Sequence, residues 1–355
     1  MRSKLSATTS LGLFKSVAPA FAIVISLLAE IVFAADVTST WSAATSGNWN
    51  ANANWTNAPA LGGFPNNGNG GVVTYDAVIN ASGAPYTVTL STNVTIEDLL
   101  LNSVDATLAH MSGTFTATGA ISLGAGAYRL SGGTISNTTI NSTGGALAIA
   151  AFNANLLNGV TMNGDLTLNV TDGRTRIAGG TTFNTAHLAA TNVGVGFAPG
   201  QTLAGTILFE GAGLGDRAVE MDGTAGNFTV GPTGVMRTAS GLASNVRIAG
   251  GAWWYGGAMT LTNEGLISSQ TSGRTMTIGA PSLTNNATGI LEAANGGILT
   301  INSTNWSNAG NLRALGGSTA NLSGAWSNLG GTITADATST LNFGGSFSTA
   351  NLGTL

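Results

Sequence analysis

The chain has 355 residues, of which 43% are hydrophobic and only 7% charged, and it contains 52 glycines and no cysteine. Hydrophobic content this high with so little charge argues against intrinsic disorder, and the absence of cysteine excludes disulfides, a lipid-modified cysteine and thiolate metal sites. The net charge of −4 makes nucleic acid and anionic membrane surfaces poor partners.

Residues 1–34 are predicted to be a signal peptide. Three basic residues precede an apolar run over 17–34 that ends in the sequence VFA, which fits a leader with a small-residue cleavage site. We place cleavage after Ala34, with Ala35 as a near alternative. An uncleaved membrane anchor is the competing interpretation, but the run is short for a bilayer and contains a proline and a glutamate. Cleavage leaves eight arginines and fourteen acidic residues, a net charge of about −6, and no later membrane span is predicted.

The segment 35–85 is rich in tryptophan and differs from the rest of the chain. Trp41, Trp49 and Trp55 stand close together in the phrase TWSAATSGNWNANANW. Exposed rings would form a face on which carbohydrate stacks. The alternative, which we favour, is an N-terminal aromatic cap that covers the open edge of the first turn of a solenoid, because terminal repeats are atypical.

From residue 86 onward the chain alternates short strands and turns. Apolar pairs with a period of two, such as Val88/Leu90 and Val94/Ile96, recur at short intervals and are separated by Gly- and Asn-rich turns. No charge run or linker marks a second domain. We therefore predict one β-solenoid over 86–355.

One stretch, FEGAGLGDRAVEMDG, concentrates ionisable groups: Glu210, Asp216, Arg217, Glu220 and Asp222. On a strand, the side chains at positions 220 and 222 would share a face and could form a carboxylate pair or a calcium site. Such a pair beside an arginine could also supply the catalytic groups of a carbohydrate-active enzyme. The interpretation that we favour is an outward loop whose charges keep a neutral coil soluble.

Other chemistry has little support in the sequence. The glycines before Asp216 match only half of one calcium-binding repeat, and no lysine follows them as in a phosphate loop. His110 and His187 lie far apart, and neither has an acidic residue at metal-ligand spacing. No serine stands in a nucleophile motif. The sequence therefore predicts no catalytic residue, no metal and no cofactor.

The stretch 262–347 repeats one pattern four times. The units cover 262–283, 284–306, 307–326 and 327–347, and read TNEGLISSQTSGRTMTIGAPSL, TNNATGILEAANGGILTINSTNW, SNAGNLRALGGSTANLSGAW and SNLGGTITADATSTLNFGGSF. A unit this short cannot bury a face alone and must stack on its neighbours. Short period-2 strands joined by Gly and Asn turns predict one coil of about 20–23 residues per unit, in an all-β parallel solenoid.

Each unit places an asparagine at the same position after an opening Ser or Thr: Asn263, Asn285, Asn308 and Asn328. In stacked coils these side chains would align about 4.8 Å apart and donate hydrogen bonds from one turn to the next. We predict a structural asparagine ladder.

The chain resembles large secreted bacterial surface proteins. The resemblance rests on the opening W…SGNWN…NW…PN, the phrase YTVTLSTNVTIEDLLLNSVDATL and the closing NxGxLxA…GGxLTI coils. Such proteins include autotransporter passengers, filamentous adhesins and exported proteins with a C-terminal (PEP-CTERM) sorting tail. The resemblance implies a right-handed parallel β-helix, secreted or at the cell surface, with a structural or adhesive role. Because no motif argues for catalysis, we expect a protein that is not an enzyme. The partners that the resemblance implies are carbohydrate or a host or neighbouring-cell surface.

The end of the chain departs from that resemblance. The chain stops at STANLGTL, partway into a fifth unit, without barrel strands, an apolar sorting helix or a basic tail. We expect a truncated solenoid whose last coil is an open edge, and hence end-to-end self-association. The alternative to the adhesive role is a polysaccharide lyase or glycosidase with its site near Glu210–Asp222.

Overall fold

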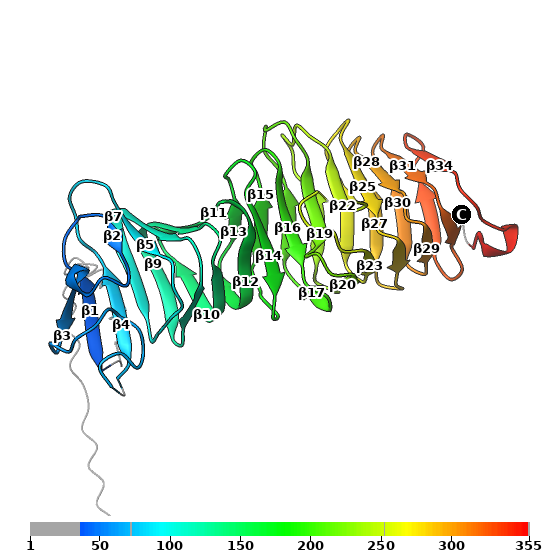
Figure 1. Cartoon of the computed structure of the whole chain (residues 1–355). Coiled ribbons are helices and arrows are strands. Elements are labelled where there is room, and N and C mark those ends of the chain that lie inside the picture. Colours follow the sequence, from blue (N-terminus) through cyan, green and yellow to red (C-terminus); the bar gives the residue numbers. More distant parts are fainter. Residues whose placement is uncertain (1–35, 72, 252, 354–355) are drawn as a thin grey trace, which may run out of the picture. The chain divides into compact units, whose positions relative to one another are not determined.

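The structure is a computed structural model that describes residues 36–71, 73–251 and 253–353. Strands account for 54% and helices for 2% of the fold, and parallel coils stack into a β-solenoid of about 12 turns (Figure 1). The predicted all-β stacked-coil class is confirmed. The predicted signal peptide lies outside the described residues. Within the described ranges, no helix is long and apolar enough to cross a bilayer.

Three sheets, called A, B and C here, run along the stack, and the pairings between their described strands are parallel except that between β1 and β3. Sheet A comprises β1 (Val37–Trp41), β2 (Gly47–Asn48), β3 (Trp55–Ala58), β4 (Tyr75–Ile79), β5 (Tyr86–Leu90), β6 (Val94–Ile96), β7 (Leu99–His110), β8 (Thr114–Ala117), β9 (Ala120–Leu130), β10 (Thr134–Ser142), β11 (Ala146–Ile149), β12 (Ala151–Asn163), β14 (Arg174–Ala178), β16 (Val193–Phe197), β19 (Arg217–Met221), β22 (Val246–Ala249), β25 (Thr275–Gly279), β28 (Ile298–Ile301), β31 (Thr319–Leu322) and β34 (Thr340–Phe343).

Sheet B comprises β13 (Leu166–Leu168), β15 (Thr185–Leu188), β18 (Thr206–Phe209), β21 (Val235–Thr238), β24 (Leu266–Ser269), β27 (Ile290–Ala293), β30 (Asn311–Ala314) and β33 (Thr332–Ala335). Sheet C comprises β17 (Gln201–Leu203), β20 (Gly226–Val230), β23 (Met259–Asn263), β26 (Ser282–Asn285), β29 (Asn305–Asn308) and β32 (Ala325–Ser327). Two short 3-10 helices, η1 (Asn52–Asn54) and η2 (Thr349–Asn351), complete the described elements.

The length of a turn follows from the register of the parallel pairs. In the repeated region Asn285 pairs with Asn308 of the next turn, and a hydrogen bond joins their side chains across 23 residues of sequence. Asn308 is bonded to Asn328, one turn further on, at a separation of 20. The predicted coil length therefore holds there.

The turns just before the repeated region are longer. Phe228 of β20 pairs with Leu261 of β23, and the Gln270 backbone N–H donates to the Thr238 hydroxyl across a sequence separation of 32. The additional residues form loops that leave the sheets, and one of these loops builds the site described below.

The core consists of columns of apolar side chains inside the turns. Because strand side chains alternate in direction, every second residue points inward, as Leu299 and Ile301 do in β28. Parallel register places each of them over its counterpart in the next turn, for example Ile278 over Ile301. Burial of each such side chain contributes roughly 1.5–3 kcal/mol relative to its exposure. The period-2 pattern in the sequence is thus the source of the fold.

The N-terminal segment pairs with the stack and carries the predicted aromatic cluster. Strand β1 pairs in parallel with β4, and β4 pairs with β7, so the ladder extends back to residue 37 rather than beginning at 86. Between β1 and β4 a long excursion carries the tryptophans. Trp41 and Trp55 meet edge to face at 5.0 Å between centroids, and Trp49 meets Trp55 at 4.8 Å.

All three of these tryptophan rings are buried, at 6% exposure or less. Their indole N–H groups donate to backbone carbonyls, as Trp49 does to Pro65 at 3.0 Å and Trp55 to Trp49 at 2.7 Å. The rings fill the first turn and present no exposed face on which a sugar could stack.

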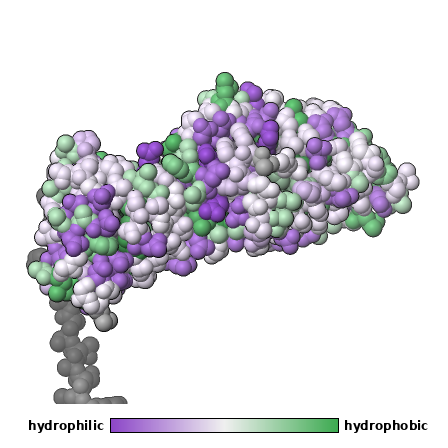
Figure 2. Space-filling view, in the orientation of Figure 1, coloured by the Kyte–Doolittle hydropathy of each residue, from purple (hydrophilic) through white to green (hydrophobic). Residues whose placement is uncertain are grey.

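The outer surface is mostly neutral and polar. On the face shown in Figure 2, hydrophobic residues are scattered among hydrophilic ones. Among the described residues, the large apolar side chains that are exposed are Leu61, Val104, Met111, Phe152, Leu214, Leu329, Phe343 and Phe347. Single exposed side chains are normal for a folded protein, whereas Phe343 and Phe347 lie together against Trp326 near the C-terminal end of the stack.

Candidate functional site

The ionisable residues of the acidic stretch do not converge on one point. Glu210 follows β18 in sheet B, whereas Arg217 and Glu220 lie in β19 of sheet A. Arg217 is fully buried, Glu220 is 4% exposed, and Asp216 and Asp222 are half-buried beside the ends of β19. The outward, solvent-exposed loop expected from the sequence is therefore not what Arg217 and Glu220 form.

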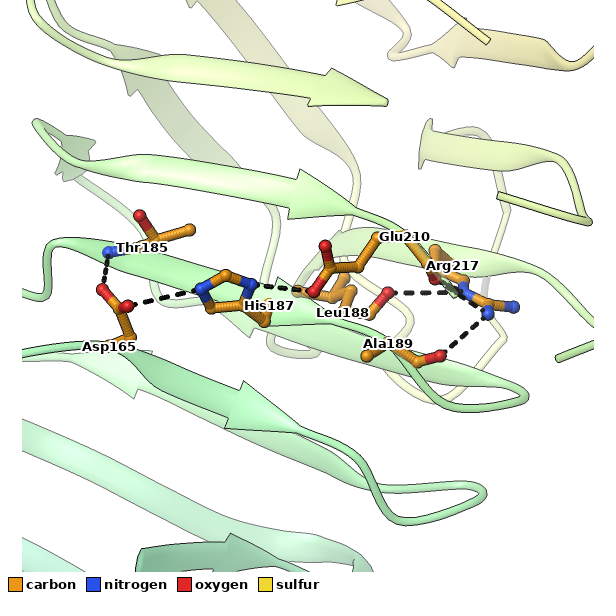
Figure 3. A network of polar contacts seen from close by, with 7 residues as sticks. All are labelled: Asp165, Thr185, His187, Leu188, Ala189, Glu210 and Arg217. Carbon is orange, nitrogen blue, oxygen red and sulfur yellow. Dashed lines mark hydrogen bonds and ion pairs between the residues drawn. The ribbon is translucent and has the colours of Figure 1, made fainter. Parts of the chain in front are cut away.

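The Arg217 guanidinium braces the inside of the turn (Figure 3). It donates to carbonyl oxygens of Leu188 (3.4 Å), Ala189 (3.1 Å), Glu210 (3.2 and 3.0 Å), Gly211 (3.4 Å), Gly213 (3.0 Å) and Gly215, and to the Ser244 hydroxyl (2.9 Å). These acceptors come from consecutive turns of the solenoid. Burial lowers the pKa of Arg217, and the nearby Asp216 opposes that shift. The arginine satisfies carbonyls of a loop that has no strand partner.

His187 lies between two carboxylates on the outer face of sheet B (Figure 3). Its Nδ1 is 2.8 Å from Glu210 Oε1 and its Nε2 is 3.4 Å from Asp165 Oδ2. Asp165 also accepts the Thr185 backbone N–H at 3.1 Å. The carboxylates come from the turns before and after His187, at sequence separations of 22 and 23. No acidic residue stands at metal-ligand spacing from His187 in the sequence, but one turn of the solenoid brings carboxylates about one repeat away into contact with it.

A loop called the strap, residues 250–258 apart from position 252, leaves sheet A after β22 and returns to β23. Ala249, Gly250 and Gly251 have φ values of 58°, 89° and 125°, and this left-handed run turns the chain off the sheet. The strap folds back over the outer face of sheet A, where Gly257 forms a bridge with Met221 of β19.

Glu220 holds the strap in place. Its carboxylate accepts the backbone N–H groups of Trp253 (2.6 Å), Trp254 (3.2 Å) and Tyr255 (3.3 Å). Burial raises the pKa of Glu220, whereas the three N–H donors and Arg247 oppose that rise. Bonds from N–H groups to a buried carboxylate are stronger than bonds between neutral groups. Glu220 is thus a structural anchor.

The tryptophans of the strap form the centre of a four-layer stack. The rings of Trp253 and Trp254 lie 4.3 Å apart at an interplanar angle of 10°. Arg247 lies over Trp253 at 5.7 Å, and Arg174 lies over Trp254 at 5.6 Å. Each ring therefore has one face on the other ring and one under a guanidinium group. Cation–π contacts of this kind fasten the strap to β14 and β22, and leave neither indole face open to a ligand.

Two glycines of β16 make room for the strap. A Cβ added to Gly194 would lie 2.6 Å from the Trp254 ring, and one added to Gly196 would lie 2.6 Å from the Tyr255 ring. Asn153 in β12 donates its side-chain amide to the Trp254 carbonyl at 3.3 Å, across a sequence separation of 101. The strap thus spans several earlier turns.

Beside the strap, the outer face of sheet A is hollowed into a groove of about 660 Å³. Its floor is formed by small residues, Ala249 and Gly279, and its polar side chains come from Arg247, Thr277 and Asn302. The glycines of the strap form one wall. This volume falls in the range of about 300–1,000 Å³ that is usual for small-molecule sites.

The four predicted ladder asparagines form one hydrogen-bonded column. The Asn263 amide donates to Asn285 Oδ1 at 2.7 Å, Asn285 to Asn308 at 2.6 Å, and Asn308 to Asn328 at 2.5 Å. All four side chains are buried. The column is internal and contributes to the stack, not to a binding surface.

Sequence reasoning missed the strap. Its signal was the phrase GGAWWYGG, in which paired glycines enclose three aromatic residues, together with the alternating glycines of VGVGF that seat them. Within the described residues, no group of three or more His, Asp or Glu side chains is placed to hold a metal ion. Comparison with protein-family models, with curated proteins and with solved structures gave no match.

Proposed function

We propose that the chain is an exported β-solenoid that works outside the cell as a structural and adhesive element and has no catalytic activity. One observation carries the proposal: the two buried charged groups of the acidic stretch, Arg217 and Glu220, are engaged in holding the turns together. Arg217 is bonded to carbonyls inside the turn, and Glu220 is bonded to N–H groups of the strap. A general acid or base needs free reach to a substrate, and these groups lack it.

Further support comes from the sequence. The predicted leader over 1–34 supports export, and the resemblance to bacterial surface β-helix proteins supports a secreted or surface location. A stack of repeated turns offers a long outer surface, which suits contact with a carbohydrate or with a host or neighbouring-cell surface. End-to-end self-association stays a prediction, and sedimentation of the purified chain would check it.

Export and adhesion are tested separately. The leader is fused to a reporter enzyme that is active only outside the cytoplasm; an active reporter is expected, and an inactive one would contradict export. Beads coated with the purified chain are then mixed with cells and with immobilised surface polysaccharides. Retention above that of beads carrying the heat-denatured chain is expected, and equal retention would contradict the adhesive role.

One observation favours the second candidate, a carbohydrate-active enzyme. Solvent reaches three neighbouring side chains, since His187 is 26%, Glu210 28% and Asp165 49% exposed. A pocket of about 230 Å³ beside Asp165 could admit part of a substrate. If these three residues were catalytic, the purified chain would release reducing ends from a polysaccharide. His187→Ala would then abolish the release while the melting temperature stayed close to that of the parent chain.

A further inference from the structure

The groove beside the strap is formed because the strap leaves sheet A and is held away from it. The left-handed run at Ala249–Gly251 lifts the chain off sheet A, and Glu220 and the tryptophan stack hold the lifted segment in place. The outer side of β25 stays uncovered next to it, where Gly279 lies under Gly250: a Cβ added to Gly279 would lie 2.6 Å from the Gly250 Cα. The groove therefore lies between the strap and the outer side of β25.

The charge of the groove indicates a neutral ligand. Arg247 is the one charged side chain among the described residues that line it. Its Nε is 2.8 Å from the Asp216 carboxylate, so the guanidinium carries a counter-ion already. An anionic ligand would meet that carboxylate and a chain of net negative charge. Arg247 nevertheless keeps further N–H donors, and its side chain is 53% exposed.

The hydrogen-bonding groups of the groove suit a ligand rich in hydroxyl groups. Thr277 supplies a hydroxyl and Asn302 an amide, so that both donors and acceptors are present. The strap glycines Gly250, Gly251, Gly256 and Gly257 expose peptide groups without side chains in front of them.

Apolar contacts are also present in the groove. Pro281, Met259 and Ala249 lie among the lining residues, so the C–H face of a sugar ring has apolar atoms to pack against. A saccharide offers the same combination, with hydroxyl groups around the ring edge and C–H groups on its faces.

A polar track continues from the groove along the stack. Thr277 pairs in register with Thr300, Thr300 with Asn321, and Asn321 with Asn342. The Asn321 amide donates to the Thr300 hydroxyl at 3.2 Å, and the Asn342 amide to Asn321 Oδ1 at 2.7 Å. These side chains repeat at about 4.8 Å along the outer face of sheet A. A ligand longer than the groove would therefore continue over hydroxyl and amide groups.

We propose that this groove binds a neutral polysaccharide, with one or two sugar units in the groove and the following units along the Thr–Asn track. The inference rests on the adhesive role proposed above and names its ligand class. Arg247, Thr277 and Asn302 contact the sugar hydroxyl groups, while Asp216 positions the Arg247 guanidinium. The indole faces of the strap are not part of the site, because both are covered.

The test is calorimetric titration of the purified full chain with neutral gluco-, xylo- and galacto-oligosaccharides of increasing length and with uronate oligomers as the acidic counterparts. Neutral oligosaccharides are expected to bind with an affinity that rises with length and changes little with salt. Arg247→Ala and Asn302→Ala each weaken binding about tenfold or more, which corresponds to about 1.4 kcal/mol. Arg129→Ala, which removes an exposed arginine from β9, leaves binding unchanged.

Folding is checked by circular dichroism and thermal melting, and Thr277→Tyr, which fills the groove, is a second variant should Arg247→Ala destabilise the strap. Binding of uronates alone, weakened by salt, would overturn the choice of a neutral ligand. Neutral binding that is unaffected by the groove variants would overturn the location. A chain that adheres to cells but binds no oligosaccharide contradicts the inference and leaves the adhesive role intact, whereas failure of adhesion removes both.

Discussion

The side-chain amide of Asn285 donates a hydrogen bond to Oδ1 of Asn308 at 2.6 Å, across one turn of the solenoid and a sequence separation of 23. The Asn308 amide in turn donates to Asn328, so an internal member of the column is bonded on both sides. Because these amides are buried, loss of one removes a hydrogen bond from the asparagine on each side, and water cannot reach the site to replace the lost bonds.

We therefore expect Asn308→Ala to lower the free energy of unfolding by about 1–3 kcal/mol, the usual cost of removing a partner from a buried polar group. Chemical denaturation of the parent chain and the variant provides the measurement. The matched control is Asn305→Ala in the same strand, because Asn305 is exposed and lies outside the column. Equal losses in the two variants would show that the column carries no stability.

Much of this fold could be predicted from the sequence because its determinants are local or periodic. The period-2 strands and the repeated unit fix both the inward side chains and the register, and register alone places Asn263 over Asn285. The same logic accounts for the His187 contacts, since Asp165 and Glu210 lie one turn away on either side, at separations close to the repeat length.

The strap could not be predicted in this way. Glu220 contacts Trp253 across a sequence separation of 33 residues, and Asn153 contacts Trp254 across 101 residues. The length of the repeated unit predicts neither separation. The turns around it are lengthened irregularly, so counting repeats does not give their register. The burial of Trp41 likewise depends on a long excursion between β1 and β4, which no repeat predicts.

Arg217→Ala should be strongly destabilising. The substitution removes the Arg217 hydrogen bonds to six backbone carbonyl groups, of which those of Leu188 and Gly211 keep a backbone N–H donor, at an expected cost of about 3 kcal/mol or more. Guanidinium ions at low concentration should raise the melting temperature of the variant, since they fit the vacated cavity, while lowering that of the parent chain. The control is Arg129→Ala, for which no such rescue is expected. A variant as stable as the parent would contradict the bracing role of Arg217.

His110 should make the stability of the chain fall in acid. Its ring is buried, with Nδ1 3.0 Å from the Tyr128 hydroxyl and Nε2 3.1 Å from the Gly113 carbonyl, an arrangement that suits the neutral imidazole. Burial lowers the pKa of His110 from 6.5 to about 4, against the opposing effect of the Gly113 and Ser112 carbonyls. The unfolded chain therefore takes up a proton in this range before the folded chain does.

The contribution of His110 to stability is accordingly complete above its unfolded pKa of 6.5 and is lost as the pH falls through about 4. The total loss should be about 3 kcal/mol. Urea unfolding at a series of pH values, for the parent chain and for His110→Gln, measures the difference that belongs to this residue. Parallel pH profiles for the two proteins would mean that His110 does not titrate abnormally.

Glu220→Ala should loosen the strap while the sheets stay folded. Loss of three N–H bonds to a carboxylate is expected to raise the exchange rates of the Trp253, Trp254 and Tyr255 amides at least about tenfold. Hydrogen exchange followed by mass spectrometry reads these positions directly, with Glu97→Ala between β6 and β7 as the control. Unchanged exchange in the strap would show that the tryptophan stack alone holds it.

We propose that the charged residues around Glu210–Glu220 stabilise the solenoid and perform no chemistry. The most direct measurement follows product release from neutral and acidic polysaccharides by the purified chain and by Glu210→Gln, together with the melting temperature of each. We expect that neither protein releases product and that the neutral glycans are bound and recovered intact. Release of reducing ends or unsaturated products by the parent chain, lost in Glu210→Gln at an unchanged melting temperature, would contradict it.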